Sequence, residues 1–419
     1  MNQVSRGMSK YKRFPAHKGS GVEWIGEVPE HWDVMAFKRL ASIRNGQDYK
    51  DVADPSGAFP VIGSGGEFAR ASSYLFDGES VLLGRKGTID RPLYINGPFW
   101  AVDTMFYTNI SDDAFPKFVY YSALTIPFGL YSTNTALPSM TGEDISSHVV
   151  AAPKYAEQQR IANSLDRETA RIDALIAKKT RFIELLKEKR QALITHAVTK
   201  GLNPKAKMKD SGVEWIGDVP AHWQIRRVAT LFREAIRPGD PDLPILSISI
   251  HDGITDDELA PEDRDRRVSQ IEDRTKYKRV APGDLAYNMM RAWQGAFGAV
   301  TVDGLVSPAY VVAEPADDFR TAYIEHLLRT SSAIEEMRRY SRGIADFRMR
   351  LYWDYFRDLK VCLPPEDEQN AILDLISAET RRIDLLTVKT QYSIDLLKER
   401  RSAFITAAVT GQIDLREVA

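Results

Sequence analysis

Two long stretches of the chain, both free of glycine and proline, carry apolar residues at helical spacing. No glycine or proline occurs from 154 to 200 or from 366 to 410, and apolar residues recur there at threes and fours. This spacing places them on one face of a helix. Each stretch ends at a glycine, Gly201 or Gly411, a usual helix stop. The pattern predicts two amphipathic helices, in which the following residues form the packing stripe: Ile172, Leu175, Ile183, Leu186, Ile383, Leu386, Ile394 and Leu397.

Each apolar stripe is too narrow for a helix that is buried all round. The simplest arrangement packs the two helices against each other as an antiparallel coiled coil, since a whole domain separates them in the chain. Lys179 and Thr390 interrupt the stripe, as polar positions that fix helix register do. At about 1.5 Å per residue, such helices span roughly 50 to 70 Å. The alternative is that each helix merely caps its own domain.

The regions before each helix have a different pattern, in which short apolar segments alternate with glycine-rich turns. SVLLGRKG and AVDTMFYTNI in the first region, and ILSISI and AYVVAE in the second, are typical of strands. PKFVYYSALT and TAYIEHLLRT are typical of single helices. We therefore expect an α+β protein in which two homologous α/β domains, with loops at one edge, are separated by the two long helices.

The sequence contains an internal repeat that supports this division. SGVEWIGEVPEHW at 20–32 and SGVEWIGDVPAHW at 211–223 match at eleven of thirteen positions. The helix beginning near Glu157 also aligns without gaps with the one beginning near Glu368. The predicted parts are a first domain (1–153), a first helix (154–203), a second domain (204–364) and a second helix with a tail (365–419). The short blocks at 20–32 and 211–223 and the two long helices, which together we call the frame, are repeated. The regions between each short block and its helix have diverged.

Composition narrows the protein class only a little. The one cysteine, Cys362, excludes a disulfide framework and a cysteine zinc site, and it fits a reducing cytoplasm. No apolar run reaches the length that a membrane helix needs. The net charge of −2 counts mildly against a nucleic-acid partner, but DNA binding requires only local basic patches.

Basic and amide side chains gather in the expected loops of both domains. DNA reading uses this mixture, because Arg and Lys bind phosphates and guanine while Asn and Gln bind adenine. For any single residue the competing interpretation is a solvated surface charge, and acidic residues interrupt the run from 262 to 273. The candidates are Arg70, Arg85, Lys86, Arg91, Asn134, Arg264, Arg266, Arg267, Lys276, Lys278, Arg279, Asn288, Arg291, Gln294, Arg342, Arg348 and Arg350.

The sequence shows no motif that would make it a catalyst. GSGG at 63–66 lacks the Lys and Ser/Thr of a phosphate loop, and a turn is the better interpretation. LPPE at 363–366 lacks the amide or carboxylate and the aromatic residue of a methyltransferase tetrapeptide. The seven histidines have no metal-ligand spacing, and we predict neither catalytic nor metal-binding residues. His31, His222 and the four repeated tryptophans are expected to pack in the frame, although tryptophans also stack on bases.

These features together resemble one known family, the specificity subunits of type I restriction–modification systems. The resemblance rests on WIGEVPEHW and WIGDVPAHW, the proline-led EQ-x-x-I helix starts at 153–161 and 364–372, and the RID…LLKE-x-R…IT-x-AVT helices. It covers nearly the whole chain, but it assigns no individual base contact.

The resemblance implies two target recognition domains, each of which reads one half of a bipartite, asymmetric site in double-stranded DNA. The helices would set the gap, two methyltransferase subunits would dock on the repeated frame, and restriction subunits would join them. S-adenosylmethionine, ATP and Mg²⁺ would then belong to the partner subunits and not to this chain, which would act in the cytoplasm without a membrane. The alternatives are a DNA methyltransferase or nuclease that acts alone, and a helical scaffold that does not bind DNA.

Overall fold

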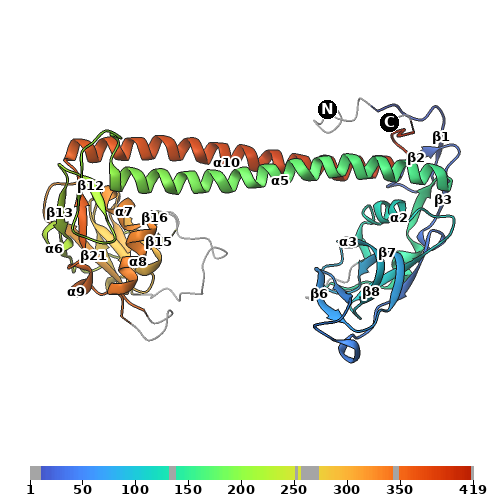
Figure 1. The fold of residues 1–419 in the computed structure, drawn as a ribbon, viewed down its shortest axis with the longest axis horizontal. Helices are drawn as coiled ribbons and strands as arrows, with labels where there is room; N and C mark the ends of the chain where they lie inside the picture. The colour runs from blue at the N-terminus through green and yellow to red at the C-terminus, as the bar shows by residue number, and fades with distance from the viewer. Residues whose placement is uncertain (1–10, 132–137, 251–252, 256–272, 343–348, 417–419) are drawn as a thin grey trace. The chain divides into compact units, whose positions relative to one another are not determined.

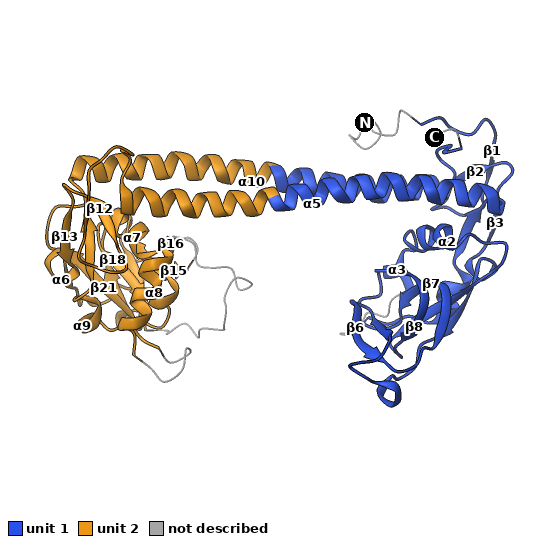
Figure 2. Cartoon of the chain, viewed as in Figure 1, with its two compact units in different colours: residues 1–181, 390–419 blue, residues 182–389 orange. Residues whose placement is uncertain are grey.

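The computed structural model describes residues 11–131, 138–250, 253–255, 273–342 and 349–416. The chain divides into two compact units (Figure 2). Unit 1 comprises residues 1–181 and 390–419, and unit 2 comprises residues 182–389. Each unit therefore contains one α/β domain and one part of each long helix. The four-part division by repeats remains a prediction, because the two units divide both helices.

Unit 1 is organised around a six-stranded sheet with the order β4-β9-β7-β8-β5-β6, in which only the β5–β8 pairing is parallel. Short strand pairs β1–β2 and β3–β10 accompany it. The strands are β1 (His17–Gly19), β2 (Glu27–Pro29), β3 (Asp33–Ala36), β4 (Ala41–Asn45), β5 (Phe59–Gly63), β6 (Gly66–Ala71), β7 (Phe76–Gly84), β8 (Leu93–Ala101), β9 (Met105–Ile110) and β10 (Val149–Ala152). The short helices are α2 (Pro116–Ala123), α3 (Phe128–Tyr131) and α4 (Gly142–Ser147).

Unit 2 has an antiparallel four-stranded sheet with the order β14-β21-β18-β19. The strands are β11 (Met208–Asp210), β12 (Asp218–Pro220), β13 (Gln224–Arg227), β14 (Phe232–Glu234), β15 (Ser247–Ser249), β16 (Gly253–Thr255), β17 (Lys278–Val280), β18 (Leu285–Asn288), β19 (Phe297–Ala299), β20 (Gly304–Val306), β21 (Tyr310–Pro315) and β22 (Lys360–Leu363). The short helices are α6 (Val228–Leu231), α7 (Thr321–Leu328), α8 (Ser331–Tyr340) and α9 (Trp353–Phe356).

The two units share one topology. The order β4-β9-β7-β8 of unit 1 recurs in unit 2 as β14-β21-β18-β19, and the pair β3–β10 recurs as β13–β22. The difference lies outside this common sheet, where β5 and β6 extend the sheet of unit 1. The predicted α+β class with two homologous domains is thus confirmed.

Both predicted long helices form, as α5 (Tyr155–Lys200) and α10 (Glu366–Val409) (Figure 1). They stop at Gly201 (φ 75°) and Gly411 (φ 74°), a left-handed conformation that glycine adopts without strain. A Cβ atom on Gly411 would lie 2.2 Å from Pro29 Cδ, so packing also requires glycine at that stop.

Within each unit the two helices pack antiparallel, and one ion pair joins them. Asp173 and Arg401 meet in unit 1 at 2.9 Å, and Arg190 and Asp384 meet in unit 2 at 3.3 Å. The two aspartates occupy equivalent repeat positions, as do the two arginines. Each pair therefore joins one copy of the repeat to the other, which is how a duplicated helix packs on itself.

The apolar stripe is only partly covered by this packing. Ile172, Leu186, Ile383 and Ile394 are buried, and Ile183 and Leu397 are half-buried. Two stripe residues at equivalent repeat positions remain exposed: 42% of Leu175 and 37% of Leu386. Two packed helices bury a narrow stripe of each other, and these leucines lie outside it.

Each short repeat block is attached to the start of a long helix by a glutamate. In unit 1 Glu157 accepts a hydrogen bond from the Trp32 indole at 3.2 Å and lies 2.9 Å from His31 Nε2. In unit 2 Glu368 bonds Trp223 at 3.0 Å and lies 2.7 Å from His222 Nε2. Both of these tryptophans are fully buried, which confirms the packing role expected for them.

The glutamine that follows each glutamate fixes the helix to the domain before it. The Gln158 side chain accepts from the Phe115 amide at 2.8 Å and donates to the Pro153 carbonyl at 2.9 Å. Gln369 makes the equivalent bonds to the Arg320 amide and the Pro364 carbonyl, at the same two distances. The repeated Glu-Gln pair is thus a junction of short block, domain and helix.

We predict that Glu157→Ala lowers the stability of unit 1 by about 1 to 3 kcal/mol, because the buried Trp32 indole N–H loses its acceptor. Calorimetry of the full chain measures this as a lower unfolding temperature. Lys178→Ala, an exposed change on the same helix, is the control and should unfold like the unchanged protein. Equal unfolding temperatures for both variants would contradict the role of the junction.

Candidate nucleic-acid interface

In unit 1 two predicted basic residues lie in a tight loop that follows the central strand β7. The amides of Arg85 and Lys86 both donate to the Thr104 carbonyl, at 2.8 and 3.2 Å. Lys86 also pairs with Ser139 in an antiparallel bridge, and Met140 donates to the Arg85 carbonyl at 3.1 Å. Gly84 is required here, since a Cβ atom on it would lie 2.3 Å from the Thr88 carbonyl oxygen. The fold thus presents the exposed Lys86 side chain from a fixed backbone.

Unit 2 has the corresponding loop after β18, at residues 288–295, which we call the β18 loop. The Asn288 side chain accepts from the Met290 amide at 3.0 Å, and the Trp293 indole donates to the Met290 carbonyl at 2.9 Å. Gly295 closes the loop at φ 91°. The backbone is fixed, while Arg291 is half-buried and Gln294 is exposed.

Arginines and aromatic rings surround the β18 loop. Leu351 donates to the Met289 carbonyl at 2.9 Å, which fixes the segment before α9 against the loop. On that segment Arg350 forms a two-bond bridge with Arg342. Such neighbouring positive charges favour contact with phosphates. Cation–π contacts complete the cluster, with Arg338 5.4 Å from the Trp293 ring and Arg342 5.0 Å from the Tyr355 ring.

The remaining described candidates lie elsewhere, and most have partners within the fold. Arg70 pairs with Glu67, Lys276 with Asp273, and Arg279 with Asp303. Lys278 donates to the Tyr310 carbonyl, and burial lowers its pKa. Arg91 is exposed in the segment between β7 and β8. These candidates remain predictions, as do those outside the described residues: Asn134, Arg264, Arg266, Arg267 and Arg348.

The sequence-based candidates omit several side chains of the β18 loop and its surroundings. Arg338 and the aromatic or thioether side chains beside it were not among the candidates, namely Met290, Trp293, Tyr352 and Tyr355. For the tyrosines a signal was present in the aromatic-rich segment RLYWDYF at 350–356. It was missed because apolar residues in a chain usually indicate core, and only the folded chain shows that these side chains are partly or largely exposed.

Unit 1 contains a buried histidine, His148, directly after α4. His148 follows α4, stacks on Trp24 at a centroid distance of 5.2 Å, and bonds the Tyr131 hydroxyl through Nδ1 at 2.8 Å. Burial lowers the pKa of His148 to about 4. Among the described residues its Nε2 has no hydrogen-bond partner. The ring is therefore neutral near pH 7 and serves packing.

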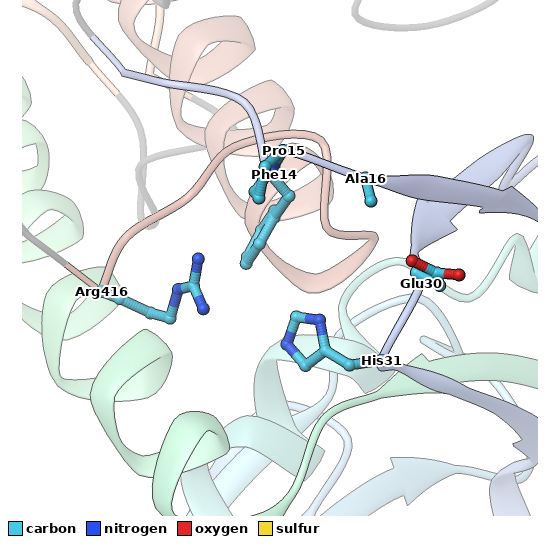
Figure 3. Close-up of a pocket in the computed structure, with 6 residues that line it drawn as sticks. All are labelled: Phe14, Pro15, Ala16, Glu30, His31 and Arg416. Carbon is cyan, nitrogen blue, oxygen red and sulfur yellow. The ribbon is translucent and has the colours of Figure 1, made fainter.

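The chain termini enclose a small pocket in unit 1. The amide of Asp414 donates to the Lys12 carbonyl at 2.8 Å, which joins the tail to the N-terminal segment. A pocket of about 370 Å³ lies there, and Figure 3 shows Phe14, His31 and Arg416 around it. The Arg416 guanidinium lies 4.7 Å from the Phe14 ring and is paired with Asp414 at 2.6 Å. These contacts join the C-terminal tail to the N-terminal segment of unit 1.

Neither a metal cluster nor a membrane span is found in the part of the chain that the structure describes. Within it, His, Cys, Asp and Glu side chains nowhere gather in a group of three or more that would hold a metal ion. Among the same residues no helix is both long enough and apolar enough to cross a bilayer. Fold and cluster geometry together define a duplicated binding protein with one loop cluster in each unit.

Comparisons with known proteins agree on one family. Residues 29–185 match the family model described as the type I restriction modification DNA specificity domain. The EcoBI specificity subunit of Escherichia coli is 21% identical over 94% of this chain and 88% of its own. The EcoDI specificity subunit of the same organism is 26% identical, over 41% of this chain and 39% of its own length.

A solved structure supports the fold over nearly the whole length. It comes from work on complex assembly and conformational transition of the type I restriction–modification system. Its chain matches with a TM-score of 0.64 and 14% identity, over 91% of this chain and 98% of that one. By the family model over residues 29–185 and by its curated relatives, the chain resembles the specificity subunits of type I restriction–modification systems. This likeness agrees with the function predicted from the sequence, a non-catalytic subunit that recognises a DNA target.

We predict that His148 makes unit 1 sensitive to acid. Its folded pKa lies below the ordinary value of 6.5, so its stability contribution is complete above pH 6.5 and falls as the unfolded chain alone takes up a proton. Between pH 6.5 and 4 the loss approaches about 3 kcal/mol. Urea unfolding at both pH values should show a smaller loss for His148→Gln than for the unchanged chain. His17→Gln is the control, and equal losses in all three proteins would refute the assignment.

Proposed function

We propose that each unit reads one half of a bipartite, asymmetric site in double-stranded DNA. The observation that supports this most is the contrast between frame and loops. The Glu–Trp–His junction recurs in both units, whereas the loop after β7 carries Lys86 and the β18 loop carries Met290, Arg291 and Gln294. Equivalent frames with different loops suit two half-sites of different sequence.

We propose that two methyltransferase subunits dock on the repeated frame, and that restriction subunits join this complex. The long helices of each unit expose large apolar side chains, and exposed apolar patches mark sites of protein–protein contact. In unit 2 these include Leu385 (54% exposed) and Val388 (66%), and in unit 1 Leu175 and Tyr392. Partner helices that cover such residues would bury the outer part of the stripe.

Cofactors belong, in this proposal, to the partner subunits. Methyl transfer and ATP-driven steps need S-adenosylmethionine, ATP and Mg²⁺, and we assign their sites to the methyltransferase and restriction subunits. The chain itself contributes base and phosphate contacts. We place its action in the cytoplasm, where its DNA target lies and where the single buried Cys362 stays reduced.

Mapping methylated bases in the native host, with and without this gene, tests the proposal. Deletion should remove one split motif.

Lys86→Ala and Arg291→Ala should each relax one position of the motif, in different halves, at a cost of about 1 to 3 kcal/mol per lost base contact. The control is Arg39→Ala, an exposed arginine outside both loops. A continuous motif, or two variants that relax the same half, would contradict the proposal.

A second prediction concerns the gap. Seven residues inserted in α5 after Arg181 and in α10 after Lys389 keep the apolar stripe in phase and add about 10 Å of helix. The gap should then grow by about three base pairs at 3.4 Å each, with both half-sites unchanged. The same insertion in α5 alone shifts the ion pairs out of register and should abolish methylation. An unchanged gap in the double insertion would refute the spacer role.

A further inference from the structure

The β18 loop of unit 2 carries an exposed apolar side chain, Met290, on a hydrogen-bonded backbone. Met290 is 41% exposed, although its peptide groups are held on both sides. Its amide donates to Asn288 Oδ1 and its carbonyl accepts from the Trp293 indole. The Arg338 guanidinium lies over that indole and covers part of it. The backbone that carries the half-exposed Met290 side chain is thus held in place before any ligand binds.

The neighbours of Met290 are side chains of the types that contact DNA in other proteins. Arg291 and Gln294 extend from the same loop and carry side chains that hydrogen-bond base edges. Tyr352 (41% exposed) lies on the segment bonded to the loop through Leu351 and Met289. The loop therefore combines hydrogen-bonding and apolar groups at one surface, and a base edge with a methyl group offers the same combination.

We propose that Met290 reads the 5-methyl group of a thymine in the half-site that unit 2 recognises. This inference rests on the proposed DNA function. Thymine is the one base that presents a methyl group in the major groove, and apolar side chains recognise it by contact. Asn288 is less suited to read adenine from here, because its amide oxygen already holds the Met290 backbone. A preordered loop also loses little entropy on binding, which strengthens a small contact.

The two units differ at the position of Met290, so methyl recognition is expected in only one of them. The corresponding loop of unit 1 carries Arg85, Lys86 and Gly87, so it offers charge in place of an apolar group. The segment that faces it carries Thr141, which caps α4, where unit 2 has Tyr352. Methyl recognition by this loop therefore belongs to one half-site alone.

Deoxyuridine tests the inference directly, because it differs from thymine by the methyl group alone. The tagged full chain is purified with its partner subunits and mixed with duplexes that carry the mapped split site. Each thymine in turn is replaced by deoxyuridine, and affinity is measured by competition at fixed salt. One replacement, in one half-site, should weaken binding by about three- to tenfold, as expected for a lost methyl contact.

The variant Met290→Ala should bind the thymine and deoxyuridine duplexes equally, at the affinity of the unchanged protein for deoxyuridine. Met290→Leu should retain most of the discrimination. Met208→Ala, at a methionine of similar exposure (37%) in β11 of unit 2, is the matched control and should retain all of it. Unfolding temperatures of the variants show whether each is folded.

Several outcomes would overturn the inference while leaving the proposed function intact. They are a half-site for unit 2 without thymine, no position sensitive to deoxyuridine, or equal discrimination by Met290→Ala and the unchanged protein. If Met290→Ala instead reduced bending of an end-labelled duplex without changing thymine discrimination, Met290 would act as a wedge between bases. Failure of the complex to retain any split site would reject the proposed function itself.

Discussion

The hydrogen bonds between a buried tryptophan and a helix-starting glutamate determine how each unit is built. Glu157 and Glu368 accept the indole N–H groups of Trp32 and Trp223, and the adjacent glutamines bind the domain before the helix. An indole N–H buried without an acceptor costs free energy, so the junction forms only when helix, block and domain meet in one way. Each junction thus joins the short block, the domain and the long helix of its unit.

The duplication explains both what the helices bury and what they leave exposed. Ile172 and Ile383 are equivalent and both are buried, while Leu175 and Leu386 are equivalent and both are exposed. A helix that packs on its own copy must use the same residues on both sides, as the Asp173–Arg401 and Asp384–Arg190 ion pairs also show. Beyond this leucine pair the exposed apolar residues are not duplicated, since Leu385, Val388 and Tyr392 correspond to Ala174, Ala177 and Arg181.

The frame was largely predictable from sequence, since its signals are local and periodic. The stretches free of glycine and proline, their glycine stops and the repeated blocks predict the α+β class and both long helices, and the structure has them. The exposure of Leu175 and Leu386 was not predictable, because apolar periodicity does not show how wide a stripe one partner helix covers. The Glu-Gln junctions were also missed, since their partners lie more than a hundred residues away or in another element.

The recognition clusters were the least predictable part, for a physical reason. Basic residues at the surface of a chain are common, and only the fold separates Arg279, paired with Asp303, from Arg342 and Arg350, which lie side by side. Nor does a sequence reveal that an apolar residue such as Met290 is held exposed, because that depends on hydrogen bonds to its own peptide groups. The frame must be the same twice and therefore repeats, whereas the loops must differ if two half-sites are to be told apart. Divergence between equivalent loops, more than their charge, is thus the sequence signal for the proposed reading surface.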